Sequence, residues 1–496
     1  MKRYYLGIDN GTTGTTALLL DENWEQAGRG YCPLTQVYPA DGWVEQDAEE
    51  IWRSVLAAVE AACRDAGAQP QQIACLGLDN VGETVVLWDR RSGKPLCNAI
   101  VWQDRRTAKT CDAMKEEHGD FVMKRAGVHI DPYFSATKIR WMLDHVDGAR
   151  EKLAAGDLLA GTMDAWLFWN MTRGALFATD FSTASRTLLM NLHTGQWDDG
   201  LLDLFGVPKP ILPEIRGSAG LYGYTDPDVF LGVRIPIAGG IVDQQAALFG
   251  HACFTPGMAK CTYGTGCFLL MNTGSTPIAS PHGLLTTAAW QLDGKKIYAL
   301  DGGVYVAGAA IQWLRDKLKI IENTAQTEQM AVEAGSSGGV YFVPAFSGLA
   351  APHWDSYARG TMVGITGATT REHIVRAALE ASAYQVKDIL DAMNADTGLA
   401  VPRLRVDGGS VVNRFLMQFQ ADLLGIPIDV PQITEVSALG AAYLGAVGAG
   451  HAEPADIAAN WKLARTYEPA MSEDERKTLM HKWHRAVERA KDWIEE

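Results

Sequence analysis

The chain opens with two short apolar runs on either side of a polar break. The runs cover residues 4–8 and 15–20, and residues 10–14 between them read Asn-Gly-Thr-Thr-Gly. Short apolar runs joined by such a break predict a β-hairpin. Its turn would be rich in hydroxyl groups and free backbone amides.

The alternation of apolar runs and polar breaks continues along both halves of the chain. Asp47 is a suitable N-cap for a first helix, with Glu50 three residues further on and Gly67 as a stop. Other apolar runs predict strands near 73–78, 84–88, 99–102, 259–263, 267–271, 339–343 and 402–406. Helices are expected near 47–66, 104–117, 307–319, 370–394, 411–424, 437–449 and 472–495.

Strands and helices mix without strict alternation, and a hairpin precedes the helices in each half. This order is typical of α/β domains with mixed sheets. A chain of 496 residues is too long for one hydrophobic core, so two such domains with a ligand cleft between them are expected. Residues 206–240 are rich in Pro and Gly and look like an excursion before the second core.

Charge and cysteine usage narrow the class of protein. The formal net charge is −15 and no Lys/Arg-rich run is present, which argues against a nucleic-acid-binding surface. The eight cysteines form no CxxC pair, which favours reduced thiols. No apolar run reaches the roughly 18 residues of a membrane span, and Asp9 comes too early for a signal-peptide core. A cytoplasmic protein that contacts neither membrane nor nucleic acid is expected.

Two aspartates at the ends of apolar runs are candidates for phosphate chemistry. Asp9 and the turn after it could hold a hydrated Mg²⁺ and the outer phosphates of a nucleotide, although such a turn is often only a hairpin. Asp243 lies between an apolar run and an apolar helix start. It is therefore either a simple N-cap or a base that takes the proton of an attacking hydroxyl.

Two further segments place small residues at strand ends, where backbone comes close to a ligand or to other backbone. They are residues 261–267 (Cys-Thr-Tyr-Gly-Thr-Gly-Cys) and 406–410 (Val-Asp-Gly-Gly-Ser). The Gly-Lys-Pro at 93–95 lacks the remainder of a Walker A loop, and the protein-kinase motifs are missing. A phosphotransferase built on this chain therefore needs another architecture.

Seven motifs, in this order, resemble the FGGY carbohydrate kinases, and within that family the glycerol kinases most. The likeness extends from about residue 4 to about residue 450. The motifs are residues 9–13 (Asp-Asn-Gly-Thr-Thr), 42–47 (Gly-Trp-Val-Glu-Gln-Asp), 98–107 (Asn-Ala-Ile-Val-Trp-Gln-Asp-Arg-Arg-Thr), 131–135 (Asp-Pro-Tyr-Phe-Ser), 243–250 (Asp-Gln-Gln-Ala-Ala-Leu-Phe-Gly), 263–268 (Tyr-Gly-Thr-Gly-Cys-Phe) and 407–409 (Asp-Gly-Gly).

The resemblance implies an actin-like fold of two ribonuclease-H-like domains with an interdomain cleft. Residues 1–250 would carry the polyol or sugar pocket and the phosphate hairpin, and residues 251–496 would bind the nucleotide. The implied activity is phosphorylation of a small polyol or sugar hydroxyl, with ATP and Mg²⁺ as cofactors. A homodimer or homotetramer is the implied assembly.

The resemblance also implies roles for individual residues. Asp243 would be the general base, and Asp9 and Asp243 would hold the metal ion. The substrate pocket would be formed by Gly82, Glu83, Trp102, Tyr133, Asp243, Gln244 and Phe268. The nucleotide would contact Thr12, Thr13, Gly14, Thr265, Gly308, Gln312, Gly409 and Asn413.

Three departures from the glycerol kinases bear on substrate and regulation. Gly82 stands where they carry an arginine before the pocket glutamate, which removes a charged donor worth about 1.5–3 kcal/mol and should open volume. Thr16 replaces an arginine near the phosphate loop, which leaves phosphate handling open. The loop near 226–234 is shortened, so inhibition by a sugar bisphosphate is not expected.

These departures leave alternatives open. The substrate is either glycerol or a longer polyol or ketose that fills the space beside Gly82. A different class of protein, an actin-like ATP-binding regulator without a small substrate, is also compatible with the fold. ATP turnover that depends on particular polyols would separate a kinase from such a regulator.

Overall fold

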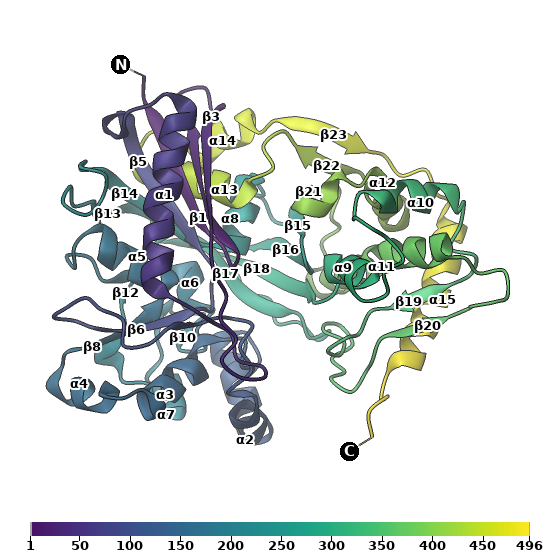
Figure 1. Ribbon diagram of the computed structural model, residues 1–496, viewed down its shortest axis with the longest axis horizontal. Coiled ribbons are helices and arrows are strands. Elements are labelled where there is room, and N and C mark those ends of the chain that lie inside the picture. The colour runs from purple at the N-terminus through teal and green to yellow at the C-terminus, as the bar shows by residue number, and fades with distance from the viewer. Residues whose placement is uncertain (1, 496) are drawn as a thin grey trace.

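The computed structural model describes residues 2–495 and has two lobes, each built on a mixed β-sheet with covering helices (Figure 1). The N-terminal half, drawn in purple and blue, forms one lobe, and much of the C-terminal half, in green and yellow, forms the other. The expected α/β fold with mixed sheets in both halves is confirmed. Among residues 2–495, no helix is both long and apolar enough to cross a membrane.

The first sheet has six strands, in which a hairpin meander is joined to parallel strands. β1 pairs antiparallel with β2 and parallel with β5, and β14 continues the parallel part. The strand order is β13 (Ala219–Tyr224), β14 (Pro236–Val242), β5 (Ile73–Asn80), β1 (Tyr4–Asn10), β2 (Gly14–Leu20) and β3 (Gln26–Pro33).

The second sheet repeats this plan with seven strands. β15 pairs antiparallel with β16 and parallel with β21. The order is β17 (Leu285–Leu292), β18 (Lys295–Val304), β16 (Cys267–Gly274), β15 (Ala259–Tyr263), β21 (Leu404–Asp407), β22 (Ile428–Pro431) and β23 (Leu463–Tyr467).

A smaller four-stranded sheet consists of β4 (Glu45–Gln46), β7 (Ala99–Ile100), β6 (Val85–Asp89) and β8 (Leu158–Thr162). The remaining short strands are β9 (Ala178–Asp180), β10 (Met190–Asn191), β11 (Gln196–Trp197), β12 (Glu214–Arg216), β19 (Tyr341–Val343) and β20 (Thr361–Val363).

Helices surround the sheets in both lobes (Figure 1). They are α1 (Ala48–Ala66), α2 (Ala108–Ala126), α3 (Ser135–His145), α4 (Ala149–Ala155), α5 (Met163–Met171), α6 (Phe181–Ala184), α7 (Asp199–Phe205), α8 (Asp243–Gly250), α9 (Gly308–Asp316), α10 (Gln326–Glu333), α11 (Arg371–Thr397), α12 (Arg414–Leu424), α13 (Val436–Gly448), α14 (Pro454–Asn460) and α15 (Glu473–Ala490).

Helix α13 belongs to the C-terminal half in sequence but packs against β1, β5 and β14 of the first sheet. The contact is made by backbone: a Cβ on Gly7 or on Gly77 would lie 1.9 Å from the carbonyl oxygen of Ala438 or Ala441. Glycine is therefore required on these strands, because any side chain would push the helix away. One hydrophobic cluster consequently contains residues of both halves, among them Phe249, Trp290 and Tyr443. A boundary near residue 250 stays a prediction.

The hairpin at the N-terminus and the first helix are confirmed. Asp47 accepts a hydrogen bond from the Glu49 backbone amide at 2.8 Å, as an N-cap does. Glu50 instead accepts a hydrogen bond from the backbone amide of Thr35.

Two expectations about the elements are wrong. Residues 206–240 are not an excursion, since they include β13 and most of β14, and β14 pairs with β5 inside the first sheet. Several of the Pro and Gly residues that suggested a loop lie inside the strands, namely Gly220 and Gly223 in β13 and Pro236, Gly239 and Gly240 in β14. Helix α2 begins at Ala108 rather than near residue 104, because Asp104 accepts from the Val44 backbone amide and binds Arg106, which holds this segment as a turn.

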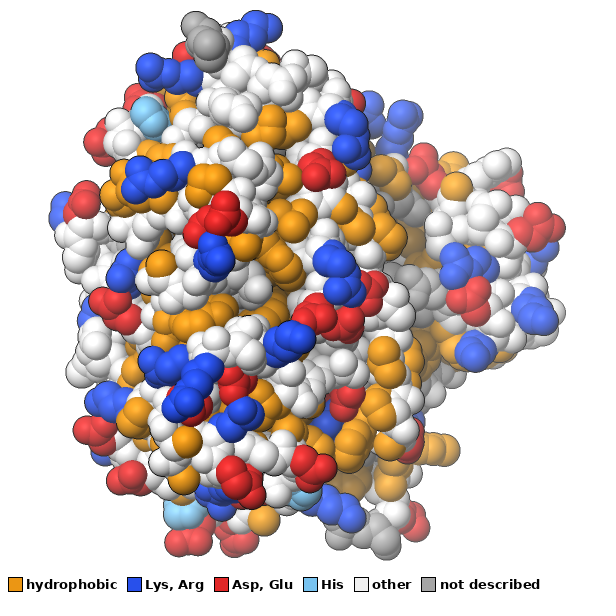
Figure 2. Space-filling model, turned by 60° about the vertical axis from the view of Figure 1, so that its left-hand side comes forward, with side chains coloured by type: hydrophobic (Ala, Val, Ile, Leu, Met, Phe, Trp, Pro, Cys, Tyr) orange, Lys and Arg blue, Asp and Glu red, His pale blue; other side chains and the backbone are white. Residues whose placement is uncertain are grey.

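Acidic and basic side chains lie interspersed among apolar ones on the face of the molecule that Figure 2 draws. Neither sign of charge gathers into a stripe on that face.

Candidate active site

The carboxyl ends of three parallel strands bring three aspartates to one edge of the first sheet. Asp9 on β1 is in register with Asp79 on β5, and Ile241 on β14 is in register with Asp79 on the other side. Asp243 follows two residues later as the first residue of α8. The sheet topology thus joins residues that are more than 200 positions apart in sequence.

Burial makes this group of acids difficult to ionise. Burial raises the pKa of Asp9 to about 7, and the charges of Asp243 and Glu435 act in the same direction. Burial and the neighbouring Asp9 raise the pKa of Asp79 well above its usual range. The pKa of Asp243 is also raised by burial, against the opposing effect of hydrogen bonds from Gln244. A cation at this edge would stabilise the ionised carboxylates.

Asp243 is held by its neighbours rather than by solvent. Its Oδ1 accepts from the Gln244 backbone amide at 2.8 Å, and its Oδ2 accepts from Gln244 Nε2 at 3.2 Å. Gln244 Oε1 in turn accepts from Lys260 Nζ at 2.6 Å, and this fully buried lysine also donates to Thr262 at 2.8 Å. Since the ammonium group can only donate, Lys260 fixes the Gln244 amide with its NH₂ toward Asp243.

Aromatic rings and a buried ion pair surround the space next to these acids. The Trp102 and Tyr133 rings meet edge to face with centroids 5.6 Å apart. Trp102 Nε1 donates to Thr12 Oγ1 at 2.9 Å, which joins the hairpin turn to the aromatic wall. Glu83, buried beside these rings, accepts from Arg186 Nε at 2.7 Å.

Position 82 does not open onto free space, contrary to the expectation from the sequence. A Cβ on Gly82 would lie 2.5 Å from Val242 Cγ2 and 3.5 Å from Arg186 Cγ. The Arg186 guanidinium, which comes from the segment after α6, also binds Asp301 at 3.1 Å. A buried arginine from elsewhere in the chain therefore already stands beside Glu83.

A cavity of about 520 Å³, counted with its open mouth, adjoins this pocket. Tyr133, Arg186, Phe268 and Asp301 line it, together with His129 and Trp354. The His129 and Trp354 rings meet edge to face with centroids 5.0 Å apart. Phe268 thus lies with Tyr133 and Arg186, as the sequence predicted for Tyr133 and Phe268.

The turn after β15 packs on two other glycine-containing segments. A Cβ on Gly308 would lie 2.4 Å from the Gly264 carbonyl oxygen, and one on Gly408 would lie 2.5 Å from the Tyr263 carbonyl oxygen. The Thr265 carbonyl accepts from the backbone amides of Ala307 and Ala309 at 3.0 Å each. Thr265, Gly308 and the Gly408–Gly409 turn are therefore close together. A Cβ added to Gly409 would have no atom within 4 Å, so the space beside this residue is open.

The other predicted nucleotide residues differ in their surroundings. Gly14 is buried and closes the hairpin turn by accepting from the Gly11 amide at 3.1 Å, while Thr13 is exposed. Gln312 is exposed on α9. Asn413 caps α12 by accepting from the Leu416 amide and donates to Thr327 Oγ1. Asn413 therefore has a structural role in addition to the predicted one.

Four buried polar residues at this site were missed from the sequence: Asp79, Arg186, Lys260 and Asp301. Lys260 could have been identified from the sequence, because it is the only charged residue inside the predicted apolar strand 259–263. Asp79 stands at the end of an apolar run, as Asp9 does. Arg186 and Asp301 lie in segments without a local pattern that marks them.

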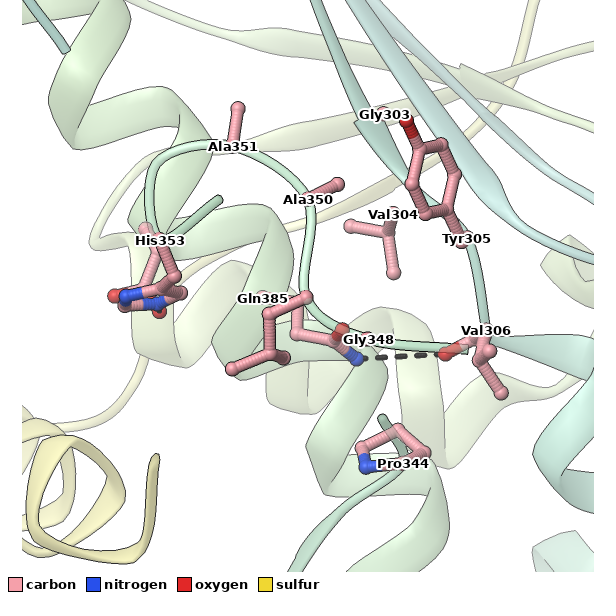
Figure 3. A pocket seen from close by; sticks show the side chains of 12 residues that line it. Gly303, Val304, Tyr305, Val306, Pro344, Gly348, Ala350, Ala351, His353 and Gln385 are labelled. Carbon is pink, nitrogen blue, oxygen red and sulfur yellow. Dashed lines mark hydrogen bonds and ion pairs between the residues drawn. The ribbon is translucent and has the colours of Figure 1, made fainter. Parts of the chain in front are cut away.

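A second pocket of about 350 Å³ lies in the C-terminal lobe (Figure 3). It is formed between the end of β18, the loop around Gly348 and helix α11, where Gln385 donates to the Val306 carbonyl oxygen at 3.4 Å. Four of its lining residues, including Tyr305 and Ala351, also line the cavity next to Tyr133. None of the predicted site residues lines it.

The donor set at the edge of the first sheet fits a magnesium ion. Asp79 is fully buried, and among residues 2–495 its carboxylate has no hydrogen-bonding neighbour except the carboxyl group of Asp9. Mg²⁺ binds through one or two carboxylates and completes its shell with water and substrate phosphates. Among residues 2–495, no group of three or more His, Cys, Asp or Glu side chains is arranged to hold a metal ion, so water and phosphate oxygens would have to supply most of the ligands.

Comparison with known proteins agrees with this geometry. The model of the FGGY family of carbohydrate kinases, N-terminal domain, matches residues 4–250, and the model of its C-terminal domain matches residues 259–449. Glycerol kinase 2 of Thermotoga maritima is 52% identical over 493 residues, 99% of each chain, and glycerol kinase of Thermus thermophilus is 52% identical over 492 residues, also 99% of each.

Solved structures show the same fold. A Plasmodium falciparum glycerol kinase with ADP superposes with a TM-score of 0.91 at 35% identity, covering 100% of this chain and 99% of that one. A xylulose kinase from Rhodospirillum rubrum, at 24% identity and a TM-score of 0.84, shares the fold over 98% of this chain and 99% of its own. The chain therefore belongs to the FGGY family of carbohydrate kinases, with their actin-like fold, and is an ATP-dependent carbohydrate or polyol kinase.

Proposed function

We propose that this kinase transfers the γ-phosphate of ATP to a hydroxyl of glycerol. The observation that carries the proposal is the buried Glu83–Arg186 pair beside the Trp102 and Tyr133 rings. A carboxylate and a guanidinium next to two aromatic faces suit a short polyol, because the charged groups bind hydroxyls while the rings cover the carbon chain. The full-length likeness to glycerol kinases supports the same substrate.

Asp243 is the base in this proposal. The substrate oxygen attacks the γ-phosphorus, the bond to the β–γ bridging oxygen breaks, ADP leaves, and the hydroxyl proton passes to an Asp243 carboxylate oxygen. Gln244 and Lys260 keep that carboxylate in place through their hydrogen bonds. Its raised pKa makes Asp243 a better proton acceptor than an ordinary aspartate.

The phosphate groups are held from both lobes. Thr12, Thr13 and Gly14 of the hairpin turn offer amides and hydroxyls from one side, and Thr265, Gly308 and Gly409 offer backbone from the other. Gln312 and Asn413 line the nucleotide site further out. Closure of the two lobes would exclude water, which otherwise competes with the polyol for the γ-phosphate.

Mg²⁺ is proposed as the metal cofactor, held by Asp9 with Asp243 near it. When bound, the ion neutralises negative charge on the phosphates. A homodimer or homotetramer remains a prediction from the resemblance, and a cytoplasmic location remains a prediction from the sequence.

A longer polyol or ketose is the second candidate. The observation that favours it is the cavity lined by Tyr133, Phe268 and Asp301, which adjoins the proposed glycerol pocket and into which a longer chain would extend. The space expected at Gly82 no longer supports this candidate, since Val242 and Arg186 occupy it.

The test is ADP release with MgATP against glycerol, erythritol, five-carbon polyols, ketoses and aldoses, followed by identification of the phosphorylated product. Glycerol as the substrate with the highest kcat/KM supports the proposal. A longer substrate with a higher kcat/KM would replace it by the second candidate. ATP hydrolysis that no polyol stimulates would contradict both.

A further inference from the structure

We propose that Asp79 is a second carboxylate ligand, paired with Asp9, for the divalent cation that accompanies the nucleotide. The inference rests on the proposed use of a metal–nucleotide complex and adds a residue to its binding site. It arises from the position of Asp79 in the sheet and from its buried carboxylate, which has no hydrogen-bonding neighbour in residues 2–495 except the Asp9 carboxyl.

The strand register places Asp79 beside Asp9. β1 and β5 are parallel and hydrogen-bonded neighbours, and Asp9 and Asp79 are direct partners in their register. Side chains in register on neighbouring strands point to the same face, roughly 5 Å apart at their origin. The two carboxylates therefore share one face of the sheet at the strand ends, next to the turn that carries Thr12 and Thr13.

Apart from the carboxyl group of Asp9, the Asp79 carboxylate has no hydrogen-bond donor in residues 2–495. The residue is 0% exposed, and its one hydrogen-bonding neighbour is Asp9, another acid. Other buried aspartates of the same lobe accept from hydroxyl and amide donors. Asp164 accepts from Thr162 and Thr179 at 2.6 and 2.7 Å, and Asp180 accepts from Ser182, Thr183 and Ser218. Burial alone is therefore not the reason that Asp79 lacks such donors.

The buried cations of the site are engaged elsewhere. Arg186 binds Glu83 and Asp301, and Lys260 donates to Gln244 and Thr262. A buried carboxylate without donor or counter-charge is strongly disfavoured in its ionised form. Asp79 must therefore either share a proton with Asp9 or face a cation that is bound there.

The position of Asp9 and Asp79 next to the proposed phosphate-binding turn favours a bound divalent cation, rather than a shared proton, when the nucleotide is bound. Mg²⁺ accepts one or two carboxylates and leaves its other positions to water and phosphate oxygens. The Asp9–Asp79 pair provides two carboxylates directly before the hairpin turn proposed to hold phosphates. Two carboxylates are too few to hold the ion without further ligands, so we expect the ion to bind weakly to the free enzyme and tightly with ADP.

The experiment measures Mn²⁺ binding to the full-length enzyme by electron paramagnetic resonance, with and without ADP. We expect ADP to increase the affinity for Mn²⁺ in the wild type. In Asp79→Asn the Mn²⁺ affinity of the ADP complex should fall at least tenfold, while ADP affinity in EDTA stays within threefold. Asp9→Asn should give a similar loss. Asp164→Asn, which removes a buried but hydrogen-bonded carboxylate, should leave the Mn²⁺ affinity unchanged.

Thermal unfolding gives a second readout that does not depend on turnover. Saturating Mn²⁺ and ADP should raise the melting temperature of the wild type more than ADP with EDTA does, and Asp79→Asn should lose this metal-dependent increment. Mn²⁺ affinity within twofold of the wild type in a folded Asp79→Asn protein would overturn the inference, and would leave Asp79 and Asp9 as a proton-sharing pair. If the Mn²⁺ affinity of Asp79→Asn is unchanged but the wild type phosphorylates glycerol normally, the proposed function stands and only the role of Asp79 is wrong. Tight, Asp79-dependent Mn²⁺–ADP binding without phosphorylation of any polyol would overturn the proposed function alone.

Discussion

Arg186 Nε donates to Glu83 Oε1 at 2.7 Å, and both side chains are about 5% exposed. The two residues are 103 positions apart in sequence. The pair brings a guanidinium to the wall of the pocket although the residue directly before Glu83 is a glycine. We therefore expect substrate recognition to depend on Arg186, which reaches Glu83 from the segment after α6.

Replacement of Arg186 by Met should weaken both substrate binding and folding. It leaves Glu83 buried without its partner, and breaking a buried pair in this way costs about 3–5 kcal/mol. We expect KM for glycerol to rise at least tenfold and the melting temperature to fall. Arg173→Met is the matched control, because Arg173 binds Asp228 where both side chains are more than 60% exposed. Equal KM values for glycerol in the two variants would show that Arg186 does not contribute to substrate binding.

Replacement of Asp243 by Asn should stop phosphoryl transfer while the nucleotide still binds. Loss of a general base lowers kcat by roughly 10²- to 10⁴-fold. We expect the Kd for ADP, measured by calorimetry, to stay within threefold of the wild type. The exposed Asp228→Asn serves as control and should keep full activity. Near-normal turnover by Asp243→Asn would show that another group accepts the proton.

An arginine introduced at position 82 should not restore a glycerol site. The new side chain begins 2.5 Å from Val242 Cγ2, and overpacking of this kind costs about 1–3 kcal/mol. We expect Gly82→Arg to lower the free energy of unfolding without improving kcat/KM for glycerol. Combination with Val242→Ala makes room and should recover part of the stability. A higher glycerol preference in the single variant would contradict the steric argument and support the expectation made from the sequence.

Replacement of Lys260 by Met should act through Gln244. Without the ammonium group, Gln244 Oε1 loses its donor, and the amide is free to turn away from Asp243. Loss of a hydrogen bond to a charged group is worth about 1.5–3 kcal/mol, so KM for the polyol should rise roughly tenfold or more. Lys296→Met, which removes a more exposed lysine near the start of β18, is the control. A change in melting temperature without any change in KM or kcat would mean that Lys260 only supports the fold.

Asp164 should make the stability of the protein depend on pH. Burial raises its pKa from 3.8 to about 6, so between these values the folded protein binds its proton more readily than the unfolded chain. This contribution is fully present below about pH 4 and is lost as the pH rises through about 6. It amounts to about 3 kcal/mol for a shift of about 2 units. Relative to Asp164→Asn, the wild type should lose this much between pH 4 and 7 in urea unfolding. A constant difference across that range would show that Asp164 does not titrate there.

The sequence alone determined the local elements whose signal is carried by neighbouring residues. The N-terminal hairpin and helix α1 follow from apolar runs, glycine turns and the Asp47 cap. The seven motifs pointed to the family and placed Asp9, Asp243, Trp102 and Tyr133 at one site, because each motif combines residue types and spacing that are rare by chance. The segment 206–240 was misjudged because its turns hide the short apolar run of β14.

Only the tertiary structure decided which distant residues complete the site. Arg186 fills the place beside Gly82 because the chain after α6 passes the end of β5, and no spacing in the sequence encodes that approach. Asp79 faces another acid because parallel pairing sets it between β1 and β14, where, among residues 2–495, only the Asp9 carboxyl reaches its carboxylate. Helix α13 joins the first lobe because Gly7 and Gly77 let backbone meet backbone. Contacts of this kind depend on how strands align across hundreds of residues, which local propensity does not specify.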